Sequence, residues 1–163
     1  MTAVRRMLRN LVDALFQVLL TAWVGMLWTI GYLVAPVLFY TLDDRVLAGE
    51  IAGHMFAVSG WAGLMMGSGL LLILFPQRGI ASLRTLAFWL TALLLILTAV
   101  SLFGIQPFMQ YLKDAAQPLD VMQSPLRERF ISWHGVSSSL YLLQSLLALG
   151  LLLRIKLDRA FGH

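Results

Sequence analysis

Four long windows of the sequence contain no Asp, Glu, Lys or Arg: residues 14–42, 51–75, 85–112 and 130–153. A helix needs about 20 apolar residues to cross the hydrocarbon core of a bilayer, because each residue advances it by about 1.5 Å. Every window is long enough to cross. The first and third exceed the required length, so we expect those helices to tilt or to extend beyond the hydrocarbon. The windows predict four transmembrane helices in a single domain, residues 1–163.

The composition is typical of an integral membrane protein. Hydrophobic residues make up 60% of the 163 residues and charged residues 12%, whereas charged residues are about a quarter of a typical soluble domain. The apolar windows also lack the short alternating pattern of a membrane β-barrel. We therefore predict an all-α fold, a polytopic membrane four-helix bundle.

The distribution of Lys and Arg predicts the orientation of this bundle. Eight of the 12 basic residues lie before the first window, between the second and third, or after the fourth. The other four lie in the remaining two loops. Because short cytoplasmic loops carry the excess of Lys and Arg, both termini should be cytoplasmic. We expect the membrane to be a bacterial-type inner (plasma) membrane. We expect the first window to stay attached and not to act as a cleaved signal peptide.

Several function classes find no support in the sequence. The basic residues are scattered at the ends of the spans and form no continuous patch, so we do not expect nucleic-acid binding. The chain has no cysteine, which excludes disulfides and thiolate chemistry. It also contains no glycine-rich phosphate loop, no nucleophile elbow and no zinc-protease motif. We therefore do not expect an enzyme.

Polar side chains recur along one face of the fourth window. His134, Ser138, Tyr141, Ser145 and Ala148 follow one another at increments of four, three, four and three residues, which is a helical stripe. Such a stripe should turn away from lipid, because an unsatisfied hydroxyl or imidazole in hydrocarbon is costly. It would either join helices together or line a path through the bundle. Before the window, Ser124 and Pro125 are typical of an N-cap followed by the first residue of a helix.

Two further patterns concern helix packing. Pro36 should kink the first helix near its outer end, because proline removes a backbone hydrogen bond. The second predicted helix carries small residues at spacings of three or four, beginning just before its charge-free window, which favours close approach of another helix, although a groove for a flat ligand such as a porphyrin is the alternative. These small residues are Gly49, Gly53, Ala57, Gly60, Gly63 and Gly67.

His54 and His134 should lie at similar depths near the outer membrane face, because each comes a few residues into a span that begins on that side. Two neutral imidazoles on neighbouring helices would be able to ligate haem b axially or to bind copper, with Met55 or Met122 as an additional soft ligand. The alternative is that each imidazole bonds to a head group, to water or to a backbone carbonyl. The candidate metal ligands are therefore His134 and His54.

Four segments of the sequence also carry a family resemblance. Residues 23–28, 36–39, 106–109 and 130–138 resemble the transmembrane-protein-205-like family, whose function is unknown. The most specific element is an aromatic-x-x-x-His-Gly-x-Ser block from Phe130 to Ser137. The resemblance implies a four-helix membrane protein, distantly similar to copper-resistance-D-like proteins and to haem-linked protoporphyrinogen oxidases of bacterial membranes. It carries over to His134 alone.

Three functions remain open at this point. The first is a binding protein that holds haem or copper in an outward-facing polar pocket, with His134, His54, Tyr141 and Ser138 as candidate cofactor-binding residues. The second is a component of small-molecule or metal transport or efflux, which would use the polar stripe of the fourth helix as a pathway. The third is an accessory subunit that docks another membrane protein or a further copy of itself. The span centres hold no acidic residue, which argues against a proton-coupled carrier.

Overall fold

A computed structural model describes residues 2–160 of the chain, with side chains described for residues 3–74 and 82–155. Over the described residues the chain is helical and contains no strand. The elements in chain order are α1 (Thr2–Thr29), the π-helical turn η1 (Ile30–Val34), α2 (Ala35–Thr41), α3 (Arg45–Arg78), the 3₁₀ turn η2 (Gly79–Arg84), α4 (Leu86–Val100), the π-helical turn η3 (Ser101–Ile105), α5 (Gln106–Ala116), the 3₁₀ turn η4 (Val121–Gln123) and α6 (Arg127–Ala160).

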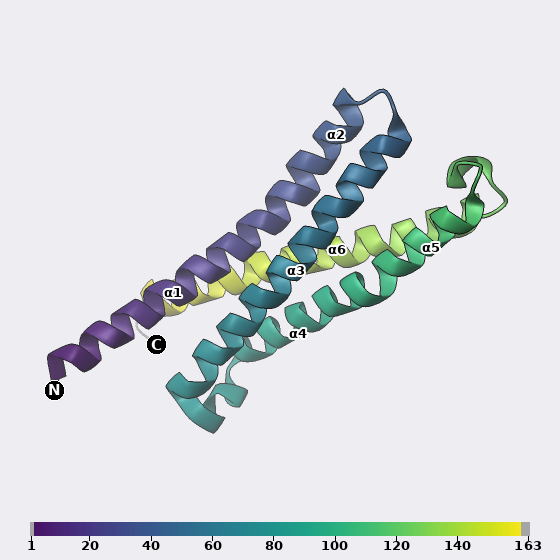
Figure 1. Cartoon of the computed structure of the whole chain (residues 1–163). Coiled ribbons are helices and arrows are strands. Elements are labelled where there is room, and N and C mark those ends of the chain that lie inside the picture. The colour runs from purple at the N-terminus through teal and green to yellow at the C-terminus, as the bar shows by residue number, and fades with distance from the viewer. Residues whose placement is uncertain (1, 161–163) are drawn as a thin grey trace.

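Four continuous helices are long and apolar enough to cross a membrane: Ala3–Thr41, Arg45–Leu74, Leu86–Ala116 and Arg127–Ile155. They form two hairpins, the first from α1, α2 and α3 and the second from α4, α5 and α6 (Figure 1). The all-α, four-helix class predicted from the charge-free windows is confirmed. The first helix continues past its window into charged residues at its N-terminal end, the third at its C-terminal end, and the second and fourth at both ends.

Each hairpin contains a π-turn that leads into a proline. η1 is followed by Pro36 and η3 by Pro107, and each proline occupies one of the first positions of the next α-helix. A π-turn opens the helix by one residue, and such turns often mark functional sites. Proline has no N–H to donate, so the carbonyl four residues before it loses its usual partner. The kink expected at Pro36 thus takes the form of a π-turn on its N-terminal side.

The core of the bundle lies in its inner half, toward the chain termini. Leu20 and Trp23 of α1, Leu70 of α3, Leu94 of α4 and Leu151 of α6 are almost completely buried there. α1 packs against α3, α3 against α4, α4 against α6 and α6 against α1, so the four spans form a closed ring. This packing fixes the inner half as a four-helix bundle.

Trp23 of the first span packs closely against two glycines of the second span, Gly63 and Gly67. A Cβ atom added at Gly63 would lie 2.7 Å from Trp23 Nε1, and one added at Gly67 would lie 2.8 Å from the Trp23 ring and from Leu95. Gly60 approaches Leu102 in the same way, whereas Gly53 has open space. The predicted stripe of small residues therefore packs closely over its inner half only. Trp23 Nε1 is buried there and has no hydrogen-bond partner among the described residues.

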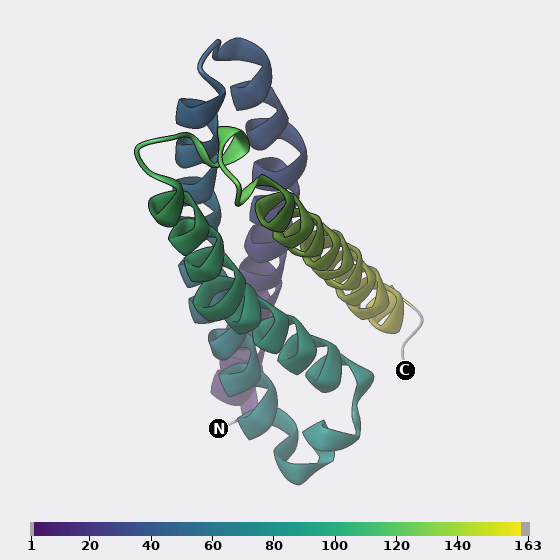
Figure 2. The same ribbon diagram turned by 90° about the vertical axis from the view of Figure 1, so that its right-hand side faces the viewer.

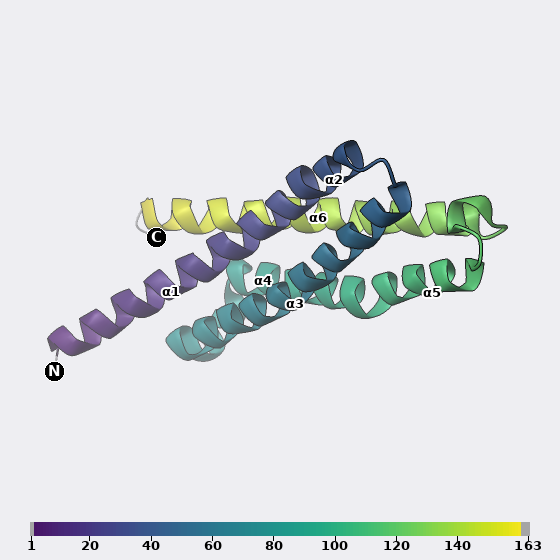
Figure 3. The same cartoon turned by 45° about the horizontal axis from the view of Figure 1, so that its top comes forward.

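The outer halves of the two hairpins separate from each other. Beyond the π-turns, α2 packs against α3 and α5 packs against α6, so each pairs within its own hairpin. Figures 1 and 3 show the α2–α3 connection and the α5–α6 connection at two distinct points, and in Figure 2 the α5–α6 connection lies in front of α2 and α3. The outer half is thus a pair of splayed hairpins and not a closed bundle.

Both chain termini lie at the end of the bundle that also carries the connection between α3 and α4 (Figure 1). The basic residues counted for the orientation gather at this end, although the side chains of Arg78, Lys156 and Arg159 lie outside the described part. At the opposite end, the Ser124 hydroxyl accepts a hydrogen bond from the Leu126 N–H at 3.1 Å, and α6 begins at Arg127. The serine therefore stabilises the turn that precedes α6, and the helix starts two residues after Pro125, the residue that the sequence predicts as its first.

Candidate functional site

Tyr141 of α6 inserts its hydroxyl into the backbone of the first span. The hydroxyl donates to the Leu27 carbonyl at 2.6 Å. In a regular α-helix the N–H of residue 31 bonds to the carbonyl of residue 27, so the hydroxyl meets the first span at the level of Gly31. A Cβ atom added at Gly31 would lie 2.2 Å from the Tyr141 ring. Only glycine leaves room for this contact.

Ser145, one turn further along α6, makes the next contact with α1. Its hydroxyl lies 2.6 Å from the Tyr32 hydroxyl, and its backbone carbonyl accepts a hydrogen bond from Trp28 Nε1 at 3.3 Å. The Ser145 hydroxyl also donates to the Leu142 carbonyl at 2.9 Å. Because Ser145 is fully buried, these bonds satisfy polar groups that would otherwise be costly in the membrane.

Gln144 ties α6 to the third span. Its amide nitrogen donates to the Thr98 hydroxyl at 3.1 Å, and that hydroxyl in turn donates to the Leu94 carbonyl at 2.8 Å. Gln144 and Thr98 are both buried. The inner part of the α6 stripe therefore joins helices on both sides of α6, which is one of the two roles expected for it.

Aromatic rings cover this hydrogen-bonded layer where the hairpins begin to separate. The Tyr141 ring lies edge-on to Phe56 of α3 at a centroid distance of 5.1 Å and tilted to Tyr32 at 6.3 Å. Tyr32 also packs on Trp28 at 4.9 Å. Tyr141 is thus the residue at which α1, α3 and α6 meet.

Beyond Tyr141 the polar stripe of α6 becomes exposed. His134 and Ser138 are both exposed, although His134 precedes Tyr141 by seven residues and so lies on nearly the same face of the helix. The exposure follows from the splaying of the hairpins, because α2 packs on α3 and no longer covers α6 at this level. The His134 ring stacks on Phe130 at a centroid distance of 6.2 Å.

His54 occupies a different side of the molecule. It follows the buried residue Ala52 by two positions and precedes the buried Gly63 by nine, and both spacings place His54 about half a rotation around the helix axis from those residues. His54 therefore points away from the packed face of α3 and is exposed. The structure does not bring it together with His134, because α3 and α6 lie across the ring of helices from each other.

The described residues contain no group of three or more His, Asp or Glu placed to hold a metal ion. The additional soft ligands suggested by the sequence, Met55 and Met122, are 37% and 42% exposed. Hollows in the described surface occur on α1, one along residues 3–11 and one around Gln17 and Val18. Neither includes His134. The outward-facing pocket proposed from the sequence therefore gains no support.

The outer end of α6 is held to α5 by a small aromatic cluster. Phe108 of α5 packs on Trp133 at a centroid distance of 4.8 Å, and the Arg129 guanidinium lies 5.3 Å from the centre of the Phe108 ring. A cation over an aromatic face is attracted by the ring quadrupole. This cluster keeps α6 paired with α5 and leaves the face bearing His134 free of its own chain.

The sequence patterns do not predict four groups of the site: the Leu27 carbonyl, Gly31, Phe56 and Thr98. A backbone carbonyl has no residue-type signature, and a threonine in a leucine-rich helix resembles ordinary packing. The spacing of Gly31 and Pro36 did carry a signal, since a glycine and a proline close together weaken the regular backbone ladder.

A family model described as a domain of unknown function, DUF4149, matches residues 18–118. The chain belongs to the DUF4149 family. The match covers most of the first three spans, including Gly31, Pro36 and the second π-turn, but ends before α6. No curated protein and no solved structure matches the chain. For this DUF4149 member, function must therefore be argued from the geometry of the site.

Proposed function

We propose that this DUF4149 protein is an accessory subunit that docks a transmembrane helix of another membrane protein between its two hairpins. The observation that carries the proposal is the change along one face of α6. Tyr141 and Ser145 bond to α1, whereas His134 and Ser138 on the same face are exposed. Polar groups at membrane depth require partners, and a polar helix from a second protein supplies them.

The separation of the hairpins supports this occupant. α2 pairs with α3 and α5 pairs with α6, so the outer half has two independent helix pairs in place of a closed ring. A helix that enters between them would meet the exposed His134 and Ser138 of α6. The imidazole and hydroxyl groups of these residues favour a partner helix that carries polar side chains.

Photo-crosslinking in intact membranes tests the proposal. Benzoylphenylalanine at Ser138 should give one discrete crosslink to a transmembrane residue of a single membrane protein. The matched control is Val136, which is 51% exposed and lies on a different face at the same depth; it should give no discrete product. His134→Ala should reduce the Ser138 crosslink. A product of twice the 18.2 kDa chain mass would indicate self-association and would contradict the proposal, as would identical results at both positions.

Haem or copper binding is the second hypothesis, and the resemblance of the Phe130–Ser137 block is its support. The residues present do not fit an axial pair of imidazoles, because His54 and His134 face different surroundings. The visible spectrum and the metal content of the purified protein test it directly. Bound haem or stoichiometric copper that is lost in His134→Ala but kept in His54→Ala would favour a single-histidine site. A transport role finds no support, since Tyr141, Gln144 and Ser145 bond to neighbouring helices.

We further propose the orientation and location predicted from the sequence, with both termini in the cytoplasm and the chain in a bacterial-type inner membrane. Support comes from the gathering of both termini and the α3–α4 connection at one end (Figure 1), because the sequence places eight of the 12 basic residues in those three segments. In this orientation His134, Ser138 and the splayed hairpins face outward.

A further inference from the structure

The N-terminal end of α1 extends beyond the bundle. Residues 3–11 are all exposed, and the first buried residue of the helix is Phe16. The span from Ala3 to Thr41 contains 39 residues, which corresponds to about 60 Å, whereas the hydrocarbon core is about 30 Å thick. Figures 1 and 3 show this end diverging from the C-terminal end of α6. It therefore lies at or beyond the membrane interface.

This extension has two chemically distinct faces. Val4, Leu8, Leu11 and Leu15 follow at increments of four, three and four residues and are 51% to 63% exposed. Because these increments match the helical repeat, the four side chains form one apolar stripe, which Met7 borders.

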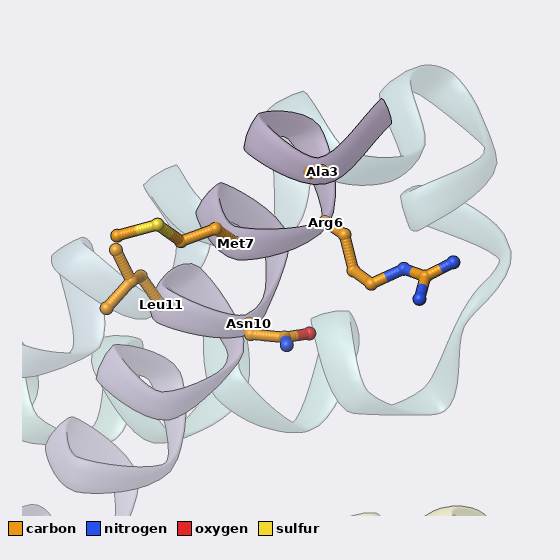
Figure 4. A pocket seen from close by; sticks show the side chains of 5 residues that line it. All are labelled: Ala3, Arg6, Met7, Asn10 and Leu11. Carbon is orange, nitrogen blue, oxygen red and sulfur yellow. The ribbon is translucent and has the colours of Figure 1, made fainter. Parts of the chain in front are cut away.

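Polar residues occupy the other face, namely Arg5, Arg6, Arg9, Asn10 and Asp13. Figure 4 shows Met7 and Leu11 on one side of the helix and Arg6 and Asn10 on the other. The extension is thus amphipathic, and neither face is covered by the rest of the described chain.

The charges identify the surface that would cover these faces. The segment from Thr2 to Val12 carries three arginines and no acidic residue. Helices with Arg on one face and Leu, Met or Val on the other lie in the membrane interface, with the apolar stripe among the acyl chains and the cations at anionic head groups. Arginine side chains are long enough to reach the phosphates while their stems cover apolar surface. The extension also emerges where the bilayer surface begins.

We propose that residues 2–13, which continue the first span as one helix, form an interfacial anchor that binds anionic lipid on the side of the chain termini. Val4, Leu8 and Leu11 contact the acyl region, and the three arginines bind lipid phosphates. This site is separate from the face around His134, so lipid binding here does not depend on the proposed docking function.

Because the chain has no native cysteine, single cysteines can carry a nitroxide label at chosen positions. The test places the label at Leu8 or at Asn10, two residues away on the polar face, in the full chain reconstituted in nanodiscs. The nanodiscs contain either phosphatidylcholine alone or phosphatidylcholine with phosphatidylglycerol. Collision with oxygen reports burial in lipid, and collision with a water-soluble nickel chelate reports exposure to water.

With phosphatidylglycerol, the label at Leu8 should favour oxygen and the label at Asn10 should favour nickel. The contrast should shrink in phosphatidylcholine alone and in the R5Q/R6Q/R9Q variant, whose thermal denaturation should be unchanged because these side chains are exposed. Equal nickel accessibility at both positions in anionic nanodiscs would overturn the proposal. So would a contrast that is the same in both lipids. Spin–spin broadening at Leu8 that disappears on dilution with unlabelled chain would assign the stripe to a second copy, and would also overturn it.

Discussion

The hydroxyl of Tyr141 donates a 2.6 Å hydrogen bond to the Leu27 carbonyl, one turn before the π-turn η1. This bond joins the fourth span to the first at the level where the helices stop forming a closed ring. On the inner side of this level the α6 stripe is hydrogen-bonded to α1 and α4, and on the outer side it is exposed. Tyr141 thus separates the structural part of the stripe from the part we assign to docking.

Removal of this hydroxyl should weaken the bundle. Tyr141→Phe leaves the ring contacts in place but deprives the Leu27 carbonyl of its donor, so we expect a loss of about 1 kcal/mol in the free energy of unfolding. The measurement is denaturation in mixed micelles followed by circular dichroism. Tyr40→Phe is the control, because Tyr40 is 92% exposed. Equal stability of the two variants would show that the Tyr141 hydroxyl contributes nothing.

The close packing of Trp23 against Gly63 should not tolerate a methyl group at this glycine. Gly63→Ala would place a Cβ atom 2.7 Å from Trp23 Nε1, and overpacking of this kind typically costs about 1–3 kcal/mol. Gly25→Ala provides the control, since nothing lies within 4 Å of a Cβ atom there. Thermal denaturation in detergent should separate the two variants. The packing described for Trp23 is wrong if Gly63→Ala melts at the same temperature as Gly25→Ala.

Gln144 and Thr98 should be energetically coupled. Their side chains share a buried hydrogen bond of 3.1 Å, and such bonds between transmembrane helices contribute about 0.6 kcal/mol on average. A double-mutant cycle with Gln144→Leu and Thr98→Val measures the coupling as the departure from additivity. Strict additivity of the two substitutions would contradict the contact.

The orientation can be read with single cysteines, because the native chain has none. Cysteine at Asp43, in the α2–α3 connection, should react with a membrane-impermeant maleimide applied to intact cells. Cysteine at Leu83, at the opposite end, should react only after the membrane is permeabilised. The reverse pattern would place the termini outside and the His134 face toward the cytoplasm.

Much of the fold could be predicted from the sequence because its signals are local. The charge-free windows determine the four spans, and Ser124 marks the start of α6 to within a few residues. The inward turn of Tyr141 and Ser145 follows from their helical spacing. Each of these features depends on a single helix and on the lipid or water around it.

Features that depend on the relative placement of two helices could not be predicted. The sequence places His54 and His134 at similar depths, but depth does not determine which way a side chain points or which helices are neighbours. The separation of the hairpins depends on how the two π-turns redirect α2 and α5. The sequence shows Pro36 and Pro107, but it does not reveal in which direction a redirected helix leaves its neighbours.

Thiol crosslinking tests the central claim, that the outer face of α6 is not covered by its own chain. Tyr32 and Ser145 contact each other through hydroxyls 2.6 Å apart. Because a cysteine side chain is several ångströms shorter than a tyrosine, the Y32C/S145C pair is too far apart for a direct disulfide but should be bridged rapidly in membranes by a bifunctional thiol reagent with a span of about 10 Å. The Y40C/S138C pair lies two turns further out on both helices and would be bridged in the same way if the bundle stayed closed. We predict that this outer pair forms little or no intramolecular crosslink with the same reagent. Equally rapid crosslinking of both pairs would show that α2 covers α6, and would contradict the splayed hairpins and the docking face that depends on them.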